Sequence, residues 1–290
     1  MRIGVVFPQT ELGGDPEAVR AYGRRVEELG FTHLLAYDHV LGADPDVHTG
    51  WAGPYDIDTT FHEPLVMFGF LAAVTTSLEL VTGVVILPQR QTALVAKQAA
   101  EVDLLSAGRL RLGIGLGWNA VEYEALGERF TTRGRRVEEQ IELLRRLWTQ
   151  RSVSFDGDHH RVTGAGIAPL PTQRPIPLWI GAASPPAYAR VGRLADGWFP
   201  MHPPGPRLTE ALSTIAAAAR DAGRDPAGIG MEGQVSWQHD LERVVADLDA
   251  WAEHGATHVA VNTMGAGLRT VEEHLAVLET VAGRVGLRPS

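Results

Sequence analysis

The stretch LGIGLGWNA, residues 112–120, has glycine at every second position, and its part 115–120 fits the G-x-G-x-x-G/A pattern of a dinucleotide-binding turn. Such a turn follows the first strand of a βαβ unit, and an acidic residue lies about 20 positions further on, at the tip of the second strand. Here the acidic candidates, Glu138 and Glu139, fall inside a predicted amphipathic helix, and the stretch follows the fourth predicted strand. The stretch therefore indicates the end of a parallel strand in a larger α/β fold rather than a site for NAD.

Short apolar segments alternate with segments of helical period along the whole chain. The predicted strands are residues 3–7, 33–37, 79–87, 109–114, 177–181, 197–200, 229–235 and 257–262. Continuous apolar runs of this kind are typical of parallel strands that are buried on both faces. A doubly wound sheet would also fit, but eight strand–helix units favour a closed (β/α)8 TIM barrel.

Residues 1–290 are predicted to form a single domain, with an insertion around residues 152–178. The insertion begins with SVSFDGDHHRV, which predicts a hairpin that turns at Asp156 and Gly157, and it continues with a proline-rich segment. The tip carries Asp158, His159 and His160 as well, and we interpret these polar side chains as solvated rather than as metal ligands. No metal site is expected elsewhere.

Composition and charge narrow the class of protein. The net charge of −9 argues against a partner that is nucleic acid or an anionic membrane surface. The chain has no cysteine, which excludes disulfides, thiolate catalysis and cysteine-ligated metals. The first residues, MRIGVVFPQ, do not form a signal peptide, and no apolar run approaches the length of a membrane span, so a cytoplasmic location is expected.

Several segments lie where predicted strands end, which is the face on which TIM barrels place their active sites. Asp38 and His39 follow the second strand, and residues 181–184 (GAAS) follow the fifth strand and open a helix. A helix N-terminus with small residues and a serine suits a phosphate group, although it is also an ordinary helix cap. The glycines of 112–120 permit either contact with a flat ligand or tight packing of the barrel, and both explanations stay open.

Seven segments occur in the order found in one family. Among them are FPQ (7–9), YDHV (37–40), TGVVILPQR (82–90), PLWIGAASPPA (177–187) and LADGWFP (194–200). Over nearly its whole length the chain resembles the bacterial luciferase-like monooxygenase superfamily, and within it the branch of oxidoreductases that use coenzyme F420.

This resemblance implies a cofactor site at the C-terminal face of the barrel and a non-proline cis peptide, placed at Gly83–Val84. His39 is the candidate catalytic residue, as a proton relay. The implied cofactor-binding residues are Asp38, His39, Thr82, Gly83, Val84, Gly115, Gly117, Trp118, Gly181, Ala182, Ala183 and Ser184.

One position departs from the pattern of some sugar-phosphate and alcohol dehydrogenases of this family. They carry a catalytic glutamate directly after the glycines of the fourth strand, where this chain has Trp118. Glu122 is a candidate substitute, but we expect it to be an exposed helix carboxylate. The long loop 41–62, with Trp51 and Phe61, is expected to fold over the barrel mouth as part of a substrate pocket.

The resemblance implies hydride transfer between F420 and a small organic substrate, catalysed by a homodimer. Two alternatives stay open. One is a monooxygenase that uses FMN and O2 with a partner reductase. The other, of a different class, is a barrel that binds a ligand without catalysing a reaction.

Overall fold

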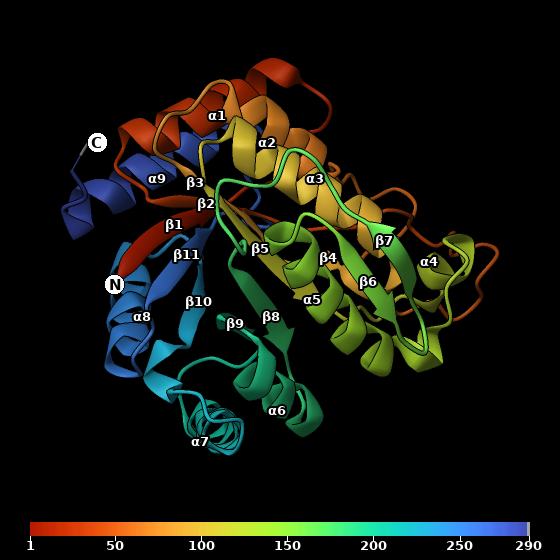
Figure 1. Cartoon of the computed structure of the whole chain (residues 1–290). Coiled ribbons are helices and arrows are strands. Elements are labelled where there is room, and N and C mark those ends of the chain that lie inside the picture. The colour runs from red at the N-terminus through yellow and green to blue at the C-terminus, as the bar shows by residue number, and fades with distance from the viewer. Residues whose placement is uncertain (289–290) are drawn as a thin grey trace.

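In the computed structural model, which describes residues 1–288, parallel strands close into a barrel that is surrounded by helices (Figure 1). The barrel strands are β1 (Arg2–Val6), β2 (His33–Ala36), β3 (Glu79–Thr82), β4 (Val85–Ile86), β5 (Leu110–Gly115), β8 (Leu178–Ala182), β9 (Gly197–Pro200), β10 (Gly230–Ser236) and β11 (His258–Asn262). They are ordered β3-β2-β1-β11-β10-β9-β8-β5-β4, and β5 also pairs with β3, which closes the sheet. β4 continues the line of β3, so the two together form one strand of the barrel. The barrel therefore has eight strand positions, and the predicted (β/α)8 fold is confirmed.

The helices cover the outside of the barrel (Figure 1). They are α1 (Pro16–Glu28), α2 (Pro64–Ala72), α3 (Thr92–Leu105), α4 (Ala120–Ala125), α5 (Arg133–Thr149), α6 (Pro185–Leu194), α7 (Pro206–Asp221), α8 (Leu241–Glu253) and α9 (Val271–Val285), with the 3-10 turns η1 (Leu87–Gln89), η2 (Phe130–Thr132) and η3 (Pro226–Gly228). The eight predicted strands agree with the barrel strands to within one residue at each end, apart from the interruption of the third. None of the helices in residues 1–288 has both the length and the apolar composition that crossing a membrane requires.

The third predicted strand, 79–87, is the one that differs most from the prediction. It is interrupted after Thr82 by a cis peptide between Gly83 and Val84, which confirms the predicted position of this bond. The chain then resumes as β4 and turns into η1.

The insertion forms the expected hairpin of β6 (Val153–Asp156) and β7 (Arg161–Ala165), which are antiparallel. One histidine at its tip is not solvated, contrary to our interpretation. The His160 ring contacts the Glu139 carboxylate of α5 at 3.1 Å and the Thr92 hydroxyl of α3 at 2.8 Å. His160 therefore attaches the hairpin to α3 and α5.

Side chains fill the inside of the barrel in layers. At the N-terminal ends of the strands lies a charged layer that contains His33, Arg111 and Glu232. Above it lies an apolar layer made of Val6, Leu35, Val81, Trp179, Phe199 and Ala260, with Tyr37 and Val84 packed on its upper side. The larger apolar core lies between the barrel and the helices. The apolar layer therefore separates the charged layer from the mouth at the C-terminal ends of the strands.

Candidate functional site at the barrel mouth

Glycines of β5 and β8 lie against Val84 at one side of the mouth. A Cβ on Gly115 would lie 2.5 Å from Val84 Cγ2, and one on Gly117 would lie 2.6 Å from Ile86 Cγ2. Tight packing thus accounts for both glycines, and Gly117 also has a left-handed backbone with φ of +67°. A Cβ on Gly181 would instead lie 3.5 Å from Val84, an ordinary contact, so packing does not require this glycine.

Polar side chains line the opposite side of the mouth. Gln234 lies on β10, where buried Glu232 lies below it on the same face, yet Gln234 itself is exposed. Its Nε2 donates a hydrogen bond to Tyr37 Oη at 2.6 Å, and Asn262 Nδ2 lies 3.4 Å from the same oxygen. Burial raises the pKa of Tyr37, so that its hydroxyl stays neutral and able to donate. The upper inner face of the barrel is therefore open to solvent and carries hydrogen-bonding groups.

His39 follows β2 and lies in a cage of aromatic rings. Its ring centre is 5.5 Å from that of Tyr55, 5.2 Å from that of Phe61 and 5.6 Å from that of Trp118, in edge-on arrangements. The side chain is 8% exposed. Its Nδ1 lies 3.1 Å from the Glu122 carboxylate, whereas its Nε2 is buried without a hydrogen-bond partner among the described residues. A buried imidazole nitrogen without a partner is costly, which marks this atom as a candidate contact for a ligand.

Glu122 is buried, so our expectation of an exposed helix carboxylate is wrong. Asn119 caps α4 through its side chain and places Glu122 in the first turn, pointing back at the loop after β2. The carboxylate accepts hydrogen bonds from the amides of Val40 and Leu41 as well as from His39. Burial acts to raise the pKa of Glu122, but these hydrogen bonds outweigh it and lower the pKa. An ionised carboxylate only accepts, so Nδ1 carries the hydrogen and Nε2 is free to exchange a proton.

Asp38 points away from His39 and is fully buried. Its carboxylate forms an ion pair with Arg90 at 2.7 Å and accepts a hydrogen bond from the Ile86 amide at 3.0 Å. Arg90 also contacts Glu63 at 2.9 Å. Burial would lower the pKa of Arg90, but the two carboxylates raise it. The structure thus commits the Asp38 carboxylate to holding β4 and Arg90 in place.

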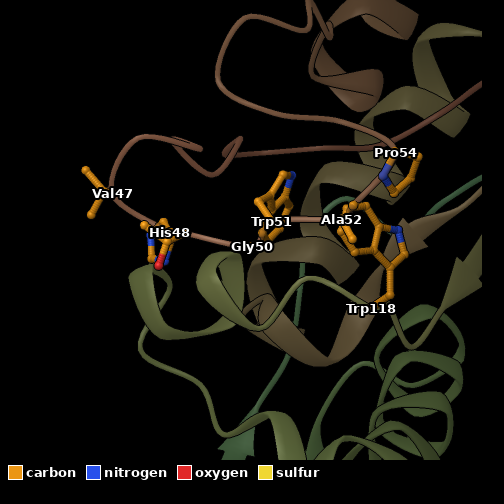
Figure 2. Close-up of a pocket in the computed structure, with 9 residues that line it drawn as sticks. Val47, His48, Gly50, Trp51, Ala52, Pro54 and Trp118 are labelled. Atoms are coloured by element: carbon orange, nitrogen blue, oxygen red, sulfur yellow. The ribbon is translucent and has the colours of Figure 1, made fainter.

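A cavity of about 710 Å³ lies beside the mouth, between Trp118 and the loop segment 47–54 (Figure 2). Figure 2 shows Trp51 and Pro54 near Trp118, with Val47 and His48 further out along the same loop. The loop 41–62 therefore contacts His39 and Trp118 at one side of the mouth, and its role as part of a substrate pocket stays a prediction.

Comparisons with known proteins identify the family. The family model described as luciferase-like monooxygenase matches residues 1–281. The chain belongs to this family.

Its relatives within the luciferase-like family differ in what is known of them. An uncharacterized protein of Mycobacterium tuberculosis is 30% identical over 98% of this chain and 99% of its own length. An F420-dependent glucose-6-phosphate dehydrogenase of Amycolatopsis mediterranei is 30% identical over 87% of this chain and 74% of its own length.

Solved structures of low sequence identity share the luciferase-like fold. An F420-dependent secondary alcohol dehydrogenase, in complex with an F420-acetone adduct, has a TM-score of 0.80 at 17% identity and covers 97% of both chains. The monooxygenase RslO1 from Streptomyces bottropensis has a TM-score of 0.75 at 21% identity and covers 98% of both chains.

The structure brings most of the predicted site residues to the mouth of this luciferase-like barrel. Those gathered there are His39, Gly83, Val84, Gly115, Gly117, Trp118, Gly181, Ala183 and Ser184. Three others direct their side chains elsewhere. Asp38 is paired with Arg90, the Thr82 hydroxyl donates to the Gly113 carbonyl at 2.7 Å, and Ala182 packs in the outer core.

Ser184 is the residue that precedes α6, as predicted, and it is exposed. Within the described part of the chain its side chain forms no capping hydrogen bond with the helix. The hydroxyl therefore stays available to an anionic group, whereas Pro185 and Pro186, the first two residues of α6, have no N–H to donate.

Arg90, Tyr37 and Gln234 are missing from the set of residues that the sequence predicts, and Glu122 is considered there only as an exposed substitute for a catalytic acid. One signal for Glu122 was present, because Asn119 followed three positions later by a glutamate is typical of a helix start. That pattern fixes Glu122 in the first helical turn after a strand end, close to the mouth. Nothing local in the sequence indicates that Arg90 pairs with Asp38, since the two residues meet only when β2 and β4 lie side by side.

Proposed function

We propose that this protein is an F420-dependent oxidoreductase that transfers a hydride between the deazaflavin and a small organic substrate at the barrel mouth. The observation that carries the proposal is the arrangement of His39, whose Nδ1 is held by Glu122 while Nε2 is buried and unpartnered. The relatives named F420-dependent glucose-6-phosphate dehydrogenase, 30% and 32% identical, favour F420 as the cofactor.

The residues of the mouth fit a planar cofactor with a charged tail. Gly181 has no packing reason to be a glycine, and it is partly exposed beside Val84. The exposed Ser184 hydroxyl at the start of α6 suits the phosphate of the tail, because it can donate a hydrogen bond and the helix dipole favours negative charge, although Pro185 and Pro186 contribute no amide. When bound in its reduced form, F420 supplies the hydride, and the protein supplies position and electrostatics.

In this proposal the protein itself supplies or accepts the proton that the reaction needs, and His39 Nε2 is the atom that exchanges it. Glu122 fixes the tautomer and orientation of the ring, and its negative charge stabilises the imidazolium that forms when Nε2 takes up a proton. The rings of Tyr55, Phe61 and Trp118 keep water from this nitrogen. Nε2 thus exchanges its proton with a substrate oxygen in a site shielded from solvent.

The cofactor is tested by calorimetric titration of the protein with F420 and, separately, with FMN. We expect F420 to bind at least about tenfold more tightly than FMN. Tight FMN binding without F420 binding would overturn the proposal in favour of the flavin-dependent monooxygenase, a function that the fold shared with RslO1 allows.

A second measurement separates an enzyme from a barrel that only binds its ligand. Reduced F420 is mixed with the protein and a panel of enones, imines and ketones, and its reoxidation is followed by absorbance under anaerobic conditions. We expect reoxidation with at least one class, and a loss of about 100-fold in rate in His39→Asn. Cofactor binding with no turnover across the panel would favour the non-catalytic barrel.

A further inference from the structure

The cavity beside Trp118 has the size of a small-molecule site. Its volume of about 710 Å³ falls within the usual range of about 300–1,000 Å³ for ligand pockets. Its walls are residues 47–54 of the loop and the indole of Trp118, which is 44% exposed. The Trp118 ring also contacts the His39 imidazole edge-on. The cavity therefore adjoins the imidazole whose Nε2 has no partner.

Two indoles shape this cavity. The Trp51 and Trp118 rings lie 5.7 Å apart at an angle of 45°, and Trp51 Nε1 donates a hydrogen bond to the Tyr55 carbonyl at 3.0 Å. A Cβ on Gly53 would lie 2.5 Å from Trp118 and 2.6 Å from Trp51, so only a glycine lets both indoles approach the loop backbone. The loop is thus built to present flat aromatic surface to whatever occupies the cavity.

The two segments that make the cavity and the cage around His39 contain no cationic side chain of the lysine or arginine type. Segment 39–62 carries the acids Asp44, Asp46, Asp56 and Asp58 and neither lysine nor arginine, and segment 115–126 carries Glu122 and Glu124 and likewise neither. Arg90, which contacts Glu63 directly after this loop, is also paired with Asp38. A phosphate group, with a charge of about −1.5 to −2, would meet two indoles and neither lysine nor arginine among the residues that line the cavity, of which His48 is the one with an ionisable side chain.

We propose that this cavity binds an uncharged planar substrate, an aromatic or conjugated carbonyl compound, and discriminates against phosphorylated and other anionic ones. The inference rests on the proposed function for the reaction, but the choice of ligand class rests on the cavity alone. This preference for uncharged ligands sets the chain apart from the relatives named glucose-6-phosphate dehydrogenase. Trp118 follows β5 at the position where some relatives carry a catalytic acid. It contributes to the same preference for uncharged ligands because it gives the cavity an aromatic wall.

The test compares three probes by calorimetry with the whole protein. 2-Naphthaldehyde is an uncharged planar carbonyl compound, 2-naphthoate is an anion of nearly the same shape, and glucose 6-phosphate represents the phosphorylated sugars. We expect 2-naphthaldehyde to bind at least about tenfold more tightly than 2-naphthoate, and glucose 6-phosphate not to bind. Trp118→Ala should weaken binding of 2-naphthaldehyde by about tenfold. Leu105→Ala, an exposed position at the end of α3, is the control and should leave it unchanged.

A charge variant tests the electrostatic part without relying on Trp118. Val47 lines the cavity and is 70% exposed, so Val47→Lys should fold and bring a cation to the rim. We expect its affinity for 2-naphthoate to exceed that of Val47→Gln by about 3–5-fold. Tighter binding of 2-naphthoate or glucose 6-phosphate than of the aldehyde by the unmodified protein would overturn the inference, as would an unchanged affinity in Trp118→Ala. Failure of the proposed function would appear separately, as absent F420 binding with the aldehyde preference intact.

Discussion

Two histidine–glutamate pairs lie at opposite ends of the same barrel, and they differ in one nitrogen. In the lower pair, His33 Nε2 contacts Glu232 at 2.9 Å and Nδ1 contacts the Thr32 hydroxyl at 2.9 Å, so both ring nitrogens have partners. In the upper pair, His39 Nδ1 contacts Glu122 at 3.1 Å and Nε2 has no partner in the described part of the chain. Arg111 Nε of the lower cluster also lacks a partner, but it lies below the apolar layer, whereas His39 Nε2 lies at the mouth.

The groups that surround the two pairs, and their access to the mouth, also differ. Glu232 also binds Arg111 at 2.5 Å, and the Arg111 guanidinium lies 4.2 Å above the Trp179 ring. The apolar layer above this lower cluster closes it off from the mouth. Three aromatic rings contact the imidazole of the upper pair, next to an open mouth. The difference teaches that burial of a charged pair does not itself mark a functional site, whereas an unsatisfied atom at the rim of a barrel does.

Loss of the lower carboxylate should produce the largest effect. Glu232→Gln leaves Arg111 buried with only the Glu79 carboxylate, at 3.2 Å, as an ionic partner. We expect the free energy of unfolding, measured by urea denaturation, to fall by about 3–5 kcal/mol. The dissociation constant for F420 should stay unchanged in protein that remains folded. A large change in F420 affinity with unchanged stability would contradict a purely structural role for the lower cluster.

The same substitution in the upper pair should affect activity instead of stability. Glu122→Gln keeps an acceptor for His39 Nδ1 but removes the negative charge that favours the protonated ring. We expect kcat to fall by about 10–100-fold while the dissociation constant for F420 changes less than about twofold. Glu124→Gln, at an exposed position on the same helix, is the matched control and should behave as the unmodified protein. Equal losses in kcat for both variants, or none, would remove Glu122 from its positioning role.

Acid should destabilise the protein through the lower cluster. Burial and the nearby Arg111 lower the pKa of His258 to about 3, and although burial acts to raise the pKa of Glu232, His33 and Arg111 lower it to about 2. In the unfolded chain both groups bind protons at higher pH, so stability falls as the pH drops below about 6.5 for His258 and below about 4.5 for Glu232.

Replacement of His258 isolates its share of this pH dependence. Between about pH 6.5 and 4.5, His258→Gln should reduce the slope of unfolding free energy against pH by up to about 1.4 kcal/mol per unit, the value for one proton. Urea denaturation at a series of pH values measures the slope. An unchanged slope would show that His258 is protonated in the folded protein.

The smallest expected effect belongs to the start of α6. Ser184→Ala should weaken F420 binding by about 3–10-fold, the loss of one hydrogen bond to a charged group, with unchanged stability because Ser184 does not cap the helix through its side chain. Ser213→Ala, an exposed serine of α7, serves as the control. Unaltered F420 affinity in Ser184→Ala would place the tail of the cofactor elsewhere.

The barrel could be predicted from the sequence because each of its determinants is local. Apolar runs of four to seven residues, helix caps such as Thr270 with Glu273, and glycines at helix ends define each unit. Eight such units then leave few ways to bury their apolar faces. The interruption of the third strand at Gly83–Val84 was predicted from the family resemblance and not from periodicity.

The site could be predicted only in part, because its partners meet across the barrel. Position at a strand end is enough to place His39, Gly181 and Ser184 at the mouth. The pairing of Asp38 with Arg90, and of His39 with Glu122, depends on which neighbouring loop folds over which strand. A helical carboxylate near a strand end is usually solvated, and only the loop after β2, through its amides at residues 40 and 41, buries Glu122.

The most direct test is a structure of the protein with F420 and 2-naphthaldehyde bound. We expect the deazaflavin ring to lie at the mouth beside Gly181, the tail phosphate to contact Ser184, and His39 Nε2 to have gained a hydrogen bond to a ligand oxygen. A ring bound away from these residues, or an Nε2 that still lacks a partner with both ligands present, would contradict the assignment of the upper pair as the functional one.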